Sequence, residues 1–448
     1  MKLRLPHPLI MLVAGVAIAA GLTWVLPAGE YTRRDDPATH RSVVVAGTYH
    51  AVPRSPVGAF GALIALPRGF IEGADVIAVV LFVGGAWVVI DRLGVLARLV
   101  ASLVAGFRRR GLLAIPVIAL FFGVMGALEN MQEEIIPLIP VLLLLGAGVG
   151  IDAVAVVGMS AGAAMIGSAF GPTNPFQAGI AMKLAQLPPA SGGLLRLAMF
   201  VVGLALWVAW TMRHAIKHRA EVPPPIPLDD AQPAARMSRK DLLLFLIAIS
   251  PMAVYVYGAI VFGWGFNELS AGFFAGAFIV GLLGGLGWEG TTIAYLEGMQ
   301  SLLPAAMLIG VARSISLVLA DGHVIDTILQ DLTTPLSHAA PAATAYLMIL
   351  AHAVIHVIVP SASGHAVLTM PVFVPLSDLL GVPRQVTVLA YQTGGGLCEL
   401  LTPTNGSLLA MLLAARVPFG RWIRFAAPGV MIALVVGIVG MGAAMAIS

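Results

Sequence analysis

The chain has 448 residues, of which 59% are hydrophobic and only 10% are charged, and its formal net charge is +3. A soluble domain carries about 25% charged residues, so this chain has too little charge to cover the surface of a soluble protein. Its single cysteine, Cys398, excludes a disulfide framework and a cysteine-based metal cluster. The basic residues occur in short clusters between apolar stretches, which is typical of membrane topology signals and argues against nucleic acid as a partner.

Apolar stretches long enough to cross about 30 Å of hydrocarbon recur along the chain. They predict nine membrane-spanning helices, at 8–27, 74–92, 151–182, 195–212, 241–263, 269–287, 298–320, 385–414 and 425–446. Polar or helix-breaking residues interrupt two more stretches, 112–148 and 344–380, and each is interpreted as a re-entrant hairpin of two half-length helices. The predicted fold class is an all-α polytopic membrane protein. A cleavable signal peptide at 8–27 is disfavoured, because the run is long and lacks a small-residue cleavage site.

Lysine and arginine near the helix ends orient the chain. Lys2 and Arg4 place the N-terminus in the cytoplasm. If both hairpins enter and leave on one side, three more basic clusters also fall inside, at 108–110, 213–240 and 416–424. Basic residues at 28–73 fall outside and weigh against this topology, although long loops translocate largely regardless of charge.

Two short patterns repeat along the chain. Phe70-Ile71-Glu72-Gly73 returns as Tyr295-Leu296-Glu297-Gly298, and Gly85 returns as Gly310 at the same offset. Pro172-Thr173-Asn174 then returns as Pro403-Thr404-Asn405, inside a long apolar segment that again follows an interrupted hairpin. An odd number of crossings separates the copies, so the repeats are predicted to be inverted.

The repeat divides the chain into four parts. The first part, 1–73, holds the first transmembrane helix and an extracytoplasmic loop. Repeat 1 spans 74–212, with a surface arm at 93–111, the hairpin at 112–148 and the broken helix at 151–182. A cytoplasmic linker at 213–240 precedes repeat 2, 241–448, with its arm at 321–340, its hairpin at 344–380 and its broken helix at 385–414. Inverted repeats with paired interruptions indicate a secondary transporter whose site lies near the membrane midplane.

Both Pro-Thr-Asn motifs are predicted to break their helices. Prolines stop regular helix, and unwound backbone at membrane depth persists only where it is buried or lines a watery cavity. Oxygen ligands for sodium are available at each break, from free backbone carbonyls, from the Thr173 and Thr404 hydroxyls and from the Asn174 and Asn405 amides. The helix that resumes after each break presents a partial positive charge to an anionic group. Gly171 and Thr402 belong to the same breaks. The alternative is that these side chains only cap the resuming helices.

The two hairpin tips differ in chemistry. The second tip, with Ser361, Ser363 and Gly364, is a small hydroxyl-rich turn whose N–H groups could bind a carboxylate. The first tip combines Asn130 with acidic residues, and ionisable groups at membrane depth indicate function. Its acids are Glu129, Glu133 and Glu134. One of the adjacent pair is expected to face the cavity and the other water; the alternative is a solvated cytoplasmic turn.

Other polar residues in apolar segments have narrower interpretations. Glu399, which precedes the second break, is the best single candidate for a proton carrier or for the partner of a substrate ammonium. Arg313 is expected to pair with Glu297 or Asp326. His352 and His356 share a helix face and could bind a metal, although the sequence places no acidic or cysteine ligand beside them. There is no Walker A loop, GxSxG elbow or HExxH motif, so an enzyme is not expected.

Several sequence features together resemble a known family. They are residues 26–31, 46–49, 133–134, 174–176 and, above all, the run from 361 to 407. They resemble the YfcC-like branch of the C4-dicarboxylate anaerobic carrier (DcuC) family, in the ion-transporter superfamily. The resemblance implies a multi-pass inner-membrane secondary carrier, similar in architecture to AbgT-type and divalent anion/sodium symporters, which are homodimers with a scaffold and a mobile elevator domain.

The resemblance also assigns residues. In those relatives, Ser-Asn-Thr motifs at the tips and breaks hold sodium and a substrate carboxylate. By resemblance, that role falls to Asn130, Thr173, Asn174, Ser361, Ser363, Thr404 and Asn405. Many relatives carry an acid in the glycine-rich run, whereas this chain has Gly394-Gly395-Gly396 there and an acid at Glu399, so sodium and proton both stay open as the coupling ion.

The resulting hypothesis is an ion-coupled secondary transporter of a small carboxylate-bearing metabolite, working by elevator-type alternating access with no other cofactor. The acids at the first tip and at Glu399 favour an amino acid over a dicarboxylate, because they would repel a dianion. A C4-dicarboxylate carrier of the same fold and, in another class, a channel are the alternatives.

Overall fold

The computed structural model describes residues 7–36, 41–99, 102, 111–172, 174–188, 191–219, 237–262 and 264–447. Within these residues, ten helical stretches are long and apolar enough to cross a membrane, which confirms an all-α polytopic membrane protein. The helices are α1 (Pro8–Val25), α2 (Ala59–Glu72), α3 (Ala74–Arg92), α5 (Ala114–Glu129), α6 (Ile139–Val149), α7 (Ala153–Val157), α8 (Ala163–Phe170), α9 (Ile180–Leu184), α10 (Gly193–Lys217), α11 (Arg239–Phe262), α12 (Phe266–Gly284), α13 (Gly287–Asp321), α14 (Ile325–Thr333), α15 (Pro341–Ile358), α16 (Ala362–Leu380), α17 (Arg384–Tyr391), α18 (Gly406–Ala414) and α19 (Phe419–Ile447).

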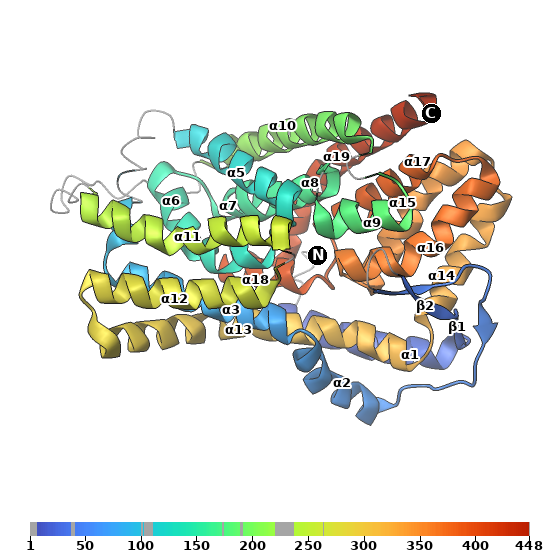
Figure 1. Ribbon diagram of the computed structural model, residues 1–448, viewed down its shortest axis with the longest axis horizontal. Helices are drawn as coiled ribbons and strands as arrows, with labels where there is room; N and C mark the ends of the chain where they lie inside the picture. Colours follow the sequence, from blue (N-terminus) through green and yellow to red (C-terminus); the bar gives the residue numbers. More distant parts are fainter. Residues whose placement is uncertain are drawn as a thin grey trace.

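Four short strands form two antiparallel pairs between α1 and α2. β1 (Gly29–Glu30) pairs with β4 (His50–Ala51), and β2 (Arg33–Asp36) pairs with β3 (Arg41–Val44). These strands lie beside α14 and α16 in Figure 1. The Tyr31 backbone N–H donates to Asp326 at 2.9 Å, so the strand segment is tied to the predicted arm at 321–340.

The helices pack as two groups (Figure 1). The first helical group comprises α1, α2, α3, α11, α12 and α13, and the second comprises α5 to α10 and α15 to α19. The span 153–170, comprising α7 and α8, is 94% buried and forms the core of the second group. The main contacts between the groups are α18 against α13 and the short 3-10 helix Glu133–Leu138 against α3.

The first repeated pattern forms a reciprocal contact in the first helical group. A Cβ atom added at Gly310 would lie 2.7 Å from the Phe70 ring, and one added at Gly85 would lie 2.8 Å from the Tyr295 ring. Phe70 corresponds to Tyr295 in the repeat and Gly310 to Gly85, so the two contacts are copies of each other with the partners exchanged. The segment α2–α3 runs antiparallel to α13, which is the packing that an inverted repeat predicts.

Both predicted broken helices are interrupted at the Pro-Thr-Asn motif. The first copy ends at Phe170 and resumes beyond Asn174, and the second ends before the motif and resumes with α18 at Gly406. Each copy also has a π-helical turn in the segment before its break, at Gly158–Gly162 and Gln392–Gly396. A π turn inserts one residue into the helical ladder and is often found at functional sites.

Two expectations for the elements were wrong in extent. Residues 59–72 were expected to be loop but form α2, because this segment packs on α13, where Gly69 lies against the Gly310 carbonyl. The arms of the second hairpin were expected to be half-length, but α15 has 18 residues and α16 has 19. At 1.5 Å per residue each arm is about 27–29 Å long, close to the hydrocarbon thickness, because Pro371 and Pro375 do not break α16. Re-entry of the hairpins stays a prediction.

Several topology signals lie outside the described residues. They are Lys2, Arg4, residues 103–110 of the first predicted arm and residues 220–236 of the linker. The orientation of the N-terminus therefore stays a prediction.

Candidate substrate and ion site

A small cavity of about 40 Å³ lies where the two helical groups meet. Val76, Ile309, Ala312 and Arg313 line it from the first group, and Glu133, Pro360, Thr404, Asn405, Gly406 and Ser407 line it from the second. Because one water molecule occupies about 30 Å³ of liquid, this conformation has room for water or a small cation but not for an organic substrate.

Glu133 faces this cavity from the first hairpin tip. Its Oε1 atom accepts a hydrogen bond from the Ser407 hydroxyl at 2.9 Å. Ser407 belongs to the first turn of α18, so this bond joins the first tip to the second break, which are 274 residues apart in the chain. The predicted residues Glu133, Thr404 and Asn405 are therefore brought together at one cavity.

Arg313 lines the same cavity, and its predicted ion pairs were wrong. Glu297 pairs with Arg92, and Asp326 pairs with Arg33 at 2.9 Å. Glu297 and Arg313 are about 24 Å apart along the axis of α13, beyond the reach of either side chain. Among the described residues Arg313 forms no ion pair, and it interacts electrostatically with Glu133. The signal that could have placed it was available: a charged group in the middle of an apolar helix indicates a functional residue.

Glu134 is also buried, with 3% of its surface exposed. One of its carboxylate oxygens accepts from the Gln132 backbone N–H at 3.1 Å. The expectations that one acid of the pair faces water, and that the tip is a solvated turn, were both wrong. The reason is tertiary: the tip folds under α3 and α18, which the sequence could not reveal.

Asn130 and Asn174 meet in a second polar cluster. Asn130 ends α5 in the left-handed conformation, with φ of 61°. Its Oδ1 atom accepts from the Ser168 hydroxyl and from the Asn174 amide, the latter at 3.1 Å. The Asn174 Oδ1 accepts from the Gln177 backbone N–H at 2.9 Å, as in a helix cap. Ser168 and Gln177 complete the cluster, and the motif analysis had not found either residue.

Asn405 has the same role at the second break. Its Oδ1 atom accepts from the Leu408 backbone N–H at 3.1 Å and caps α18. The Thr404 hydroxyl donates to the Val357 carbonyl at 2.7 Å and lies 2.7 Å from the Thr402 hydroxyl. The capping alternative thus accounts for both asparagine oxygens in this conformation, and sodium binding at Asn174 and Asn405 stays a prediction.

Glu399 joins the second break to the first hairpin tip. The carboxylate is 3% exposed and accepts a hydrogen bond from the Gln132 side-chain amide. Its other oxygen lies 3.5 Å from Nε2 of His356. The glycine run before Glu399 lets this segment approach α15 closely, because a Cβ atom at Gly394 would lie 2.3 Å from the Ile349 carbonyl oxygen.

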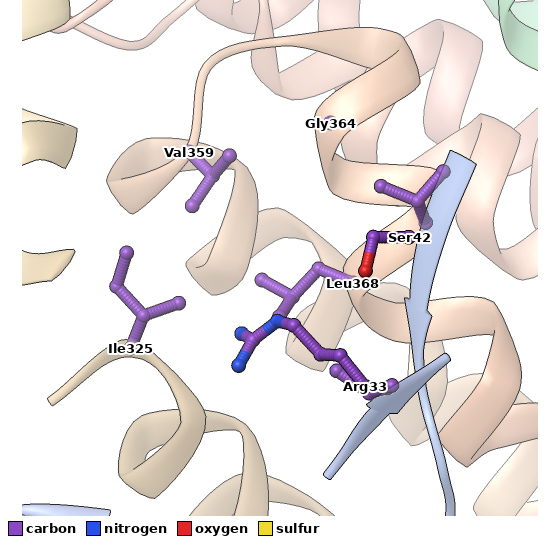
Figure 2. A pocket seen from close by; sticks show the side chains of 8 residues that line it. Arg33, Ser42, Ile325, Val359, Gly364 and Leu368 are labelled. Atoms are coloured by element: carbon purple, nitrogen blue, oxygen red, sulfur yellow. The ribbon is translucent and has the colours of Figure 1, made fainter. Parts of the chain in front are cut away.

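The second hairpin tip lies at a different and larger cavity. Ser361 caps α16 by accepting from the Gly364 N–H at 3.3 Å, and Ser363 lies in the same first turn, partly buried. Gly364 lines a cavity of about 210 Å³ into which the Arg33 guanidinium points (Figure 2). The remaining lining residues are Ser42, Val44, Ile325, Val359, Val367 and Leu368. Arg33 was not predicted, because it comes from the segment between α1 and α2, far from this tip in the sequence.

The remaining predicted residues are placed as follows. The Gly171 carbonyl accepts from the Gln392 side chain at 3.2 Å, which fixes the first break against the second π turn. Thr173 and the side chain of Glu129 lie outside the described residues.

Comparisons with known proteins identify a family and two relatives. The model of the family described as C4-dicarboxylate anaerobic carrier matches residues 5–446. An uncharacterised protein of Haemophilus influenzae is 27% identical, covering 96% of this chain and 95% of its own length. A protein of Escherichia coli strain K12, provisionally named as the basic amino acid antiporter YfcC, is 28% identical, covering 94% of this chain and 93% of its own length.

Two solved structures are similar at lower identity. The YdaH transporter of Alcanivorax borkumensis is 20% identical, with a TM-score of 0.46 and coverage of 98% of both chains. MtrF of Neisseria gonorrhoeae is 18% identical, with a TM-score of 0.43 and coverage of 98% of this chain and 94% of its own. From the family match over nearly the whole sequence, the chain belongs to the C4-dicarboxylate anaerobic carrier family and is a multi-pass membrane transporter, not an enzyme.

Proposed function

We propose that the protein is an ion-coupled secondary active transporter whose substrate is a small amino acid with a basic side chain. The observation that carries the proposal is the cavity between the helical groups, where Glu133 and Arg313 supply one carboxylate and one guanidinium. An amino acid presents the complementary pair of charges. The provisional name of the Escherichia coli relative, which refers to basic amino acids, supports the same substrate class.

The charges around the cavity favour an amino acid over a C4-dicarboxylate. Arg313 and the backbone N–H groups that open α18 suit one substrate carboxylate, because a helix N-terminus carries partial positive charge. Glu133, with Glu134 and Glu399 buried nearby, suits a cationic group. A dicarboxylate would bring a second negative charge towards these three acids. The C4-dicarboxylate alternative, which the family name supports, therefore needs those acids to be neutralised by protons or sodium.

Alternating access is proposed to occur by an elevator movement of the second helical group against the first. The cavity is too small for an amino acid in this conformation, and its walls come from both groups. A displacement of one group relative to the other would widen it, with the tip at Pro360 and the tip at Glu133 as gates. We further propose that the transporter is a homodimer in the inner membrane with a cytoplasmic N-terminus.

Transport and binding by purified protein test this proposal. Wild-type proteoliposomes should accumulate radiolabelled arginine, lysine or ornithine, and succinate or fumarate should not compete. Glu133→Gln should weaken binding of the basic amino acid at least tenfold, because among the described residues no other carboxylate lines the cavity.

Glu297→Gln is the matched control, since Glu297 pairs with Arg92 at an exposed site away from the cavity. Competition by succinate with no effect of lysine would refute the substrate class in favour of the dicarboxylate. Currents across a planar bilayer far above carrier turnover would instead establish a channel.

A further inference from the structure

Three histidines and Glu399 form a continuous buried chain beside the cavity. His352 Nδ1 lies 3.0 Å from His365 Nε2, and His365 Nδ1 lies 3.2 Å from His356 Nδ1. His356 Nε2 in turn lies 3.5 Å from Glu399 Oε1. All four side chains are at most 3% exposed.

The local structure explains why these four groups meet. His352 and His356 are one turn apart on α15 and share a face. His365 lies at the start of α16, which folds back on α15, so its ring reaches between the other two. A Cβ atom at Gly395 would lie 3.1 Å from His365 Nδ1, so the glycine run leaves the space that the rings occupy.

The geometry suits proton exchange better than metal binding. His352 Nδ1 and His365 Nε2 face each other at 3.0 Å, so one of them donates to the other, and the ring nitrogens do not converge on a common centre. Among the described residues no group of three or more His, Cys, Asp or Glu side chains is arranged to hold a metal ion. At one end of the histidine chain His356 Nε2 faces Glu399 Oε1 at 3.5 Å, and at the other end His352 Nε2 is buried without a hydrogen bond.

Counting hydrogens gives two complete arrangements of this chain. In one, Glu399 is protonated, His356 donates to His365 and His365 donates to His352. In the other, Glu399 is ionised, His356 presents Nε2–H to it, and the two histidine–histidine bonds run in the opposite direction. Passing from the first to the second moves a proton from Glu399 to His356, one from His356 to His365 and one from His365 to His352. The last proton passes from His352 Nε2 to a water molecule, which must reach this buried atom in another conformation of the transport cycle. The histidines are neutral before and after, so the net result is the transfer of one proton.

We propose that Glu399, His356, His365 and His352 form a proton relay, so that the coupling ion of the transporter is a proton. This rests on the transport function proposed above and names its coupling ion. Gln132 from the first tip contacts the Glu399 end of the relay, and Glu133 interacts with the same carboxylate. Two further titratable side chains lie next to the relay. Cys398 donates to the Ala353 carbonyl, and the Tyr391 ring, on α17, packs on His352 and His365. Neither of them is a basic group. Protonation of Glu399 thereby reaches the cavity through the first tip.

The test separates coupling from transport. Proteoliposomes containing a pH-sensitive dye are measured in two modes: net uptake of labelled lysine driven by a pH gradient, and exchange of labelled for unlabelled lysine without a gradient. His365→Gln should lower gradient-driven uptake and the accompanying proton flux at least tenfold while exchange persists. His338→Gln, at an exposed histidine in the 3-10 helix after α14, should behave as wild type.

Two results would overturn the relay. They are unchanged proton flux in His365→Gln during gradient-driven uptake, and wild-type uptake that requires sodium and is indifferent to protonophores. If His365→Gln does not elute as a folded species, His352→Gln at the end of the relay provides the same comparison. Failure of the transport proposal itself is distinguishable, because then the wild type would neither exchange nor accumulate any basic amino acid.

Discussion

The crossing of α3 and α13 gives the most direct quantitative test of the fold. A Cβ atom at Gly298 would lie 2.5 Å from the Gly84 carbonyl oxygen and 2.7 Å from the Gly85 Cα atom. Both are backbone atoms, so Gly298→Ala can be accommodated only by moving one helix relative to the other. Overpacking of this kind typically costs about 1–3 kcal/mol. With an unfolding entropy of about 2.1 cal/mol/K per residue, each kcal/mol lowers the Tm of a chain of 448 residues by about 1 °C.

Gly290→Ala is the matched control in the same helix. A Cβ atom there meets only the Leu286 side chain, at 3.4 Å, and alanine is favoured over glycine within a helix by up to about 1 kcal/mol. Thermal unfolding of both variants in one detergent should therefore show Gly298→Ala below wild type and Gly290→Ala at or above it. Equal Tm values for the two variants would refute the close crossing and, with it, the reciprocal contacts of the inverted repeat.

Three further predictions concern the site and the segment between α1 and α2. Arg313→Gln should weaken binding of a carboxylate-bearing substrate about tenfold or more, since hydrogen bonds to charged groups contribute about 1.5–3 kcal/mol; titration calorimetry checks this, and unchanged affinity would remove Arg313 from the site. Asn405→Ala should cost about 1 kcal/mol of stability through loss of the α18 cap and should abolish uptake while the protein still folds. An unchanged Tm would contradict the cap, and full uptake would contradict the binding role. Burial raises the pKa of the Tyr31 hydroxyl to about 12, above its usual value of about 10. The unfolded state therefore loses this proton first, and the stability of the protein should fall as the pH rises from about 10 to 12. Tyr31→Phe should flatten this decline in alkaline denaturation, and identical slopes for the variant and the wild type would argue against a buried hydroxyl.

Composition and local pattern alone determined the class of this protein. Apolar stretches and helix-breaking motifs are properties of short segments, so the spans, both breaks and the repeat could be read without knowing which helices touch. Glu133 and Glu399 were identified in the same way, because a carboxylate in an apolar segment is conspicuous wherever it packs.

Only the tertiary structure decided which of these residues meet. Ser407 bonds to Glu133, Gln132 bonds to Glu399, and Arg33 lines one cavity with Gly364 of the second tip. In each case the two residues are more than 250 positions apart in the chain. Arg313 was assigned the wrong partners because the rotation of α13 about its axis, which aims the guanidinium at the cavity, depends on packing against α3 and α18. The three histidines converge only when α16 folds back on α15 and the glycine run of the second π turn makes room for their rings. Side-chain periodicity fixes the face of one helix, whereas a site built from two inverted halves depends on how those faces are brought together.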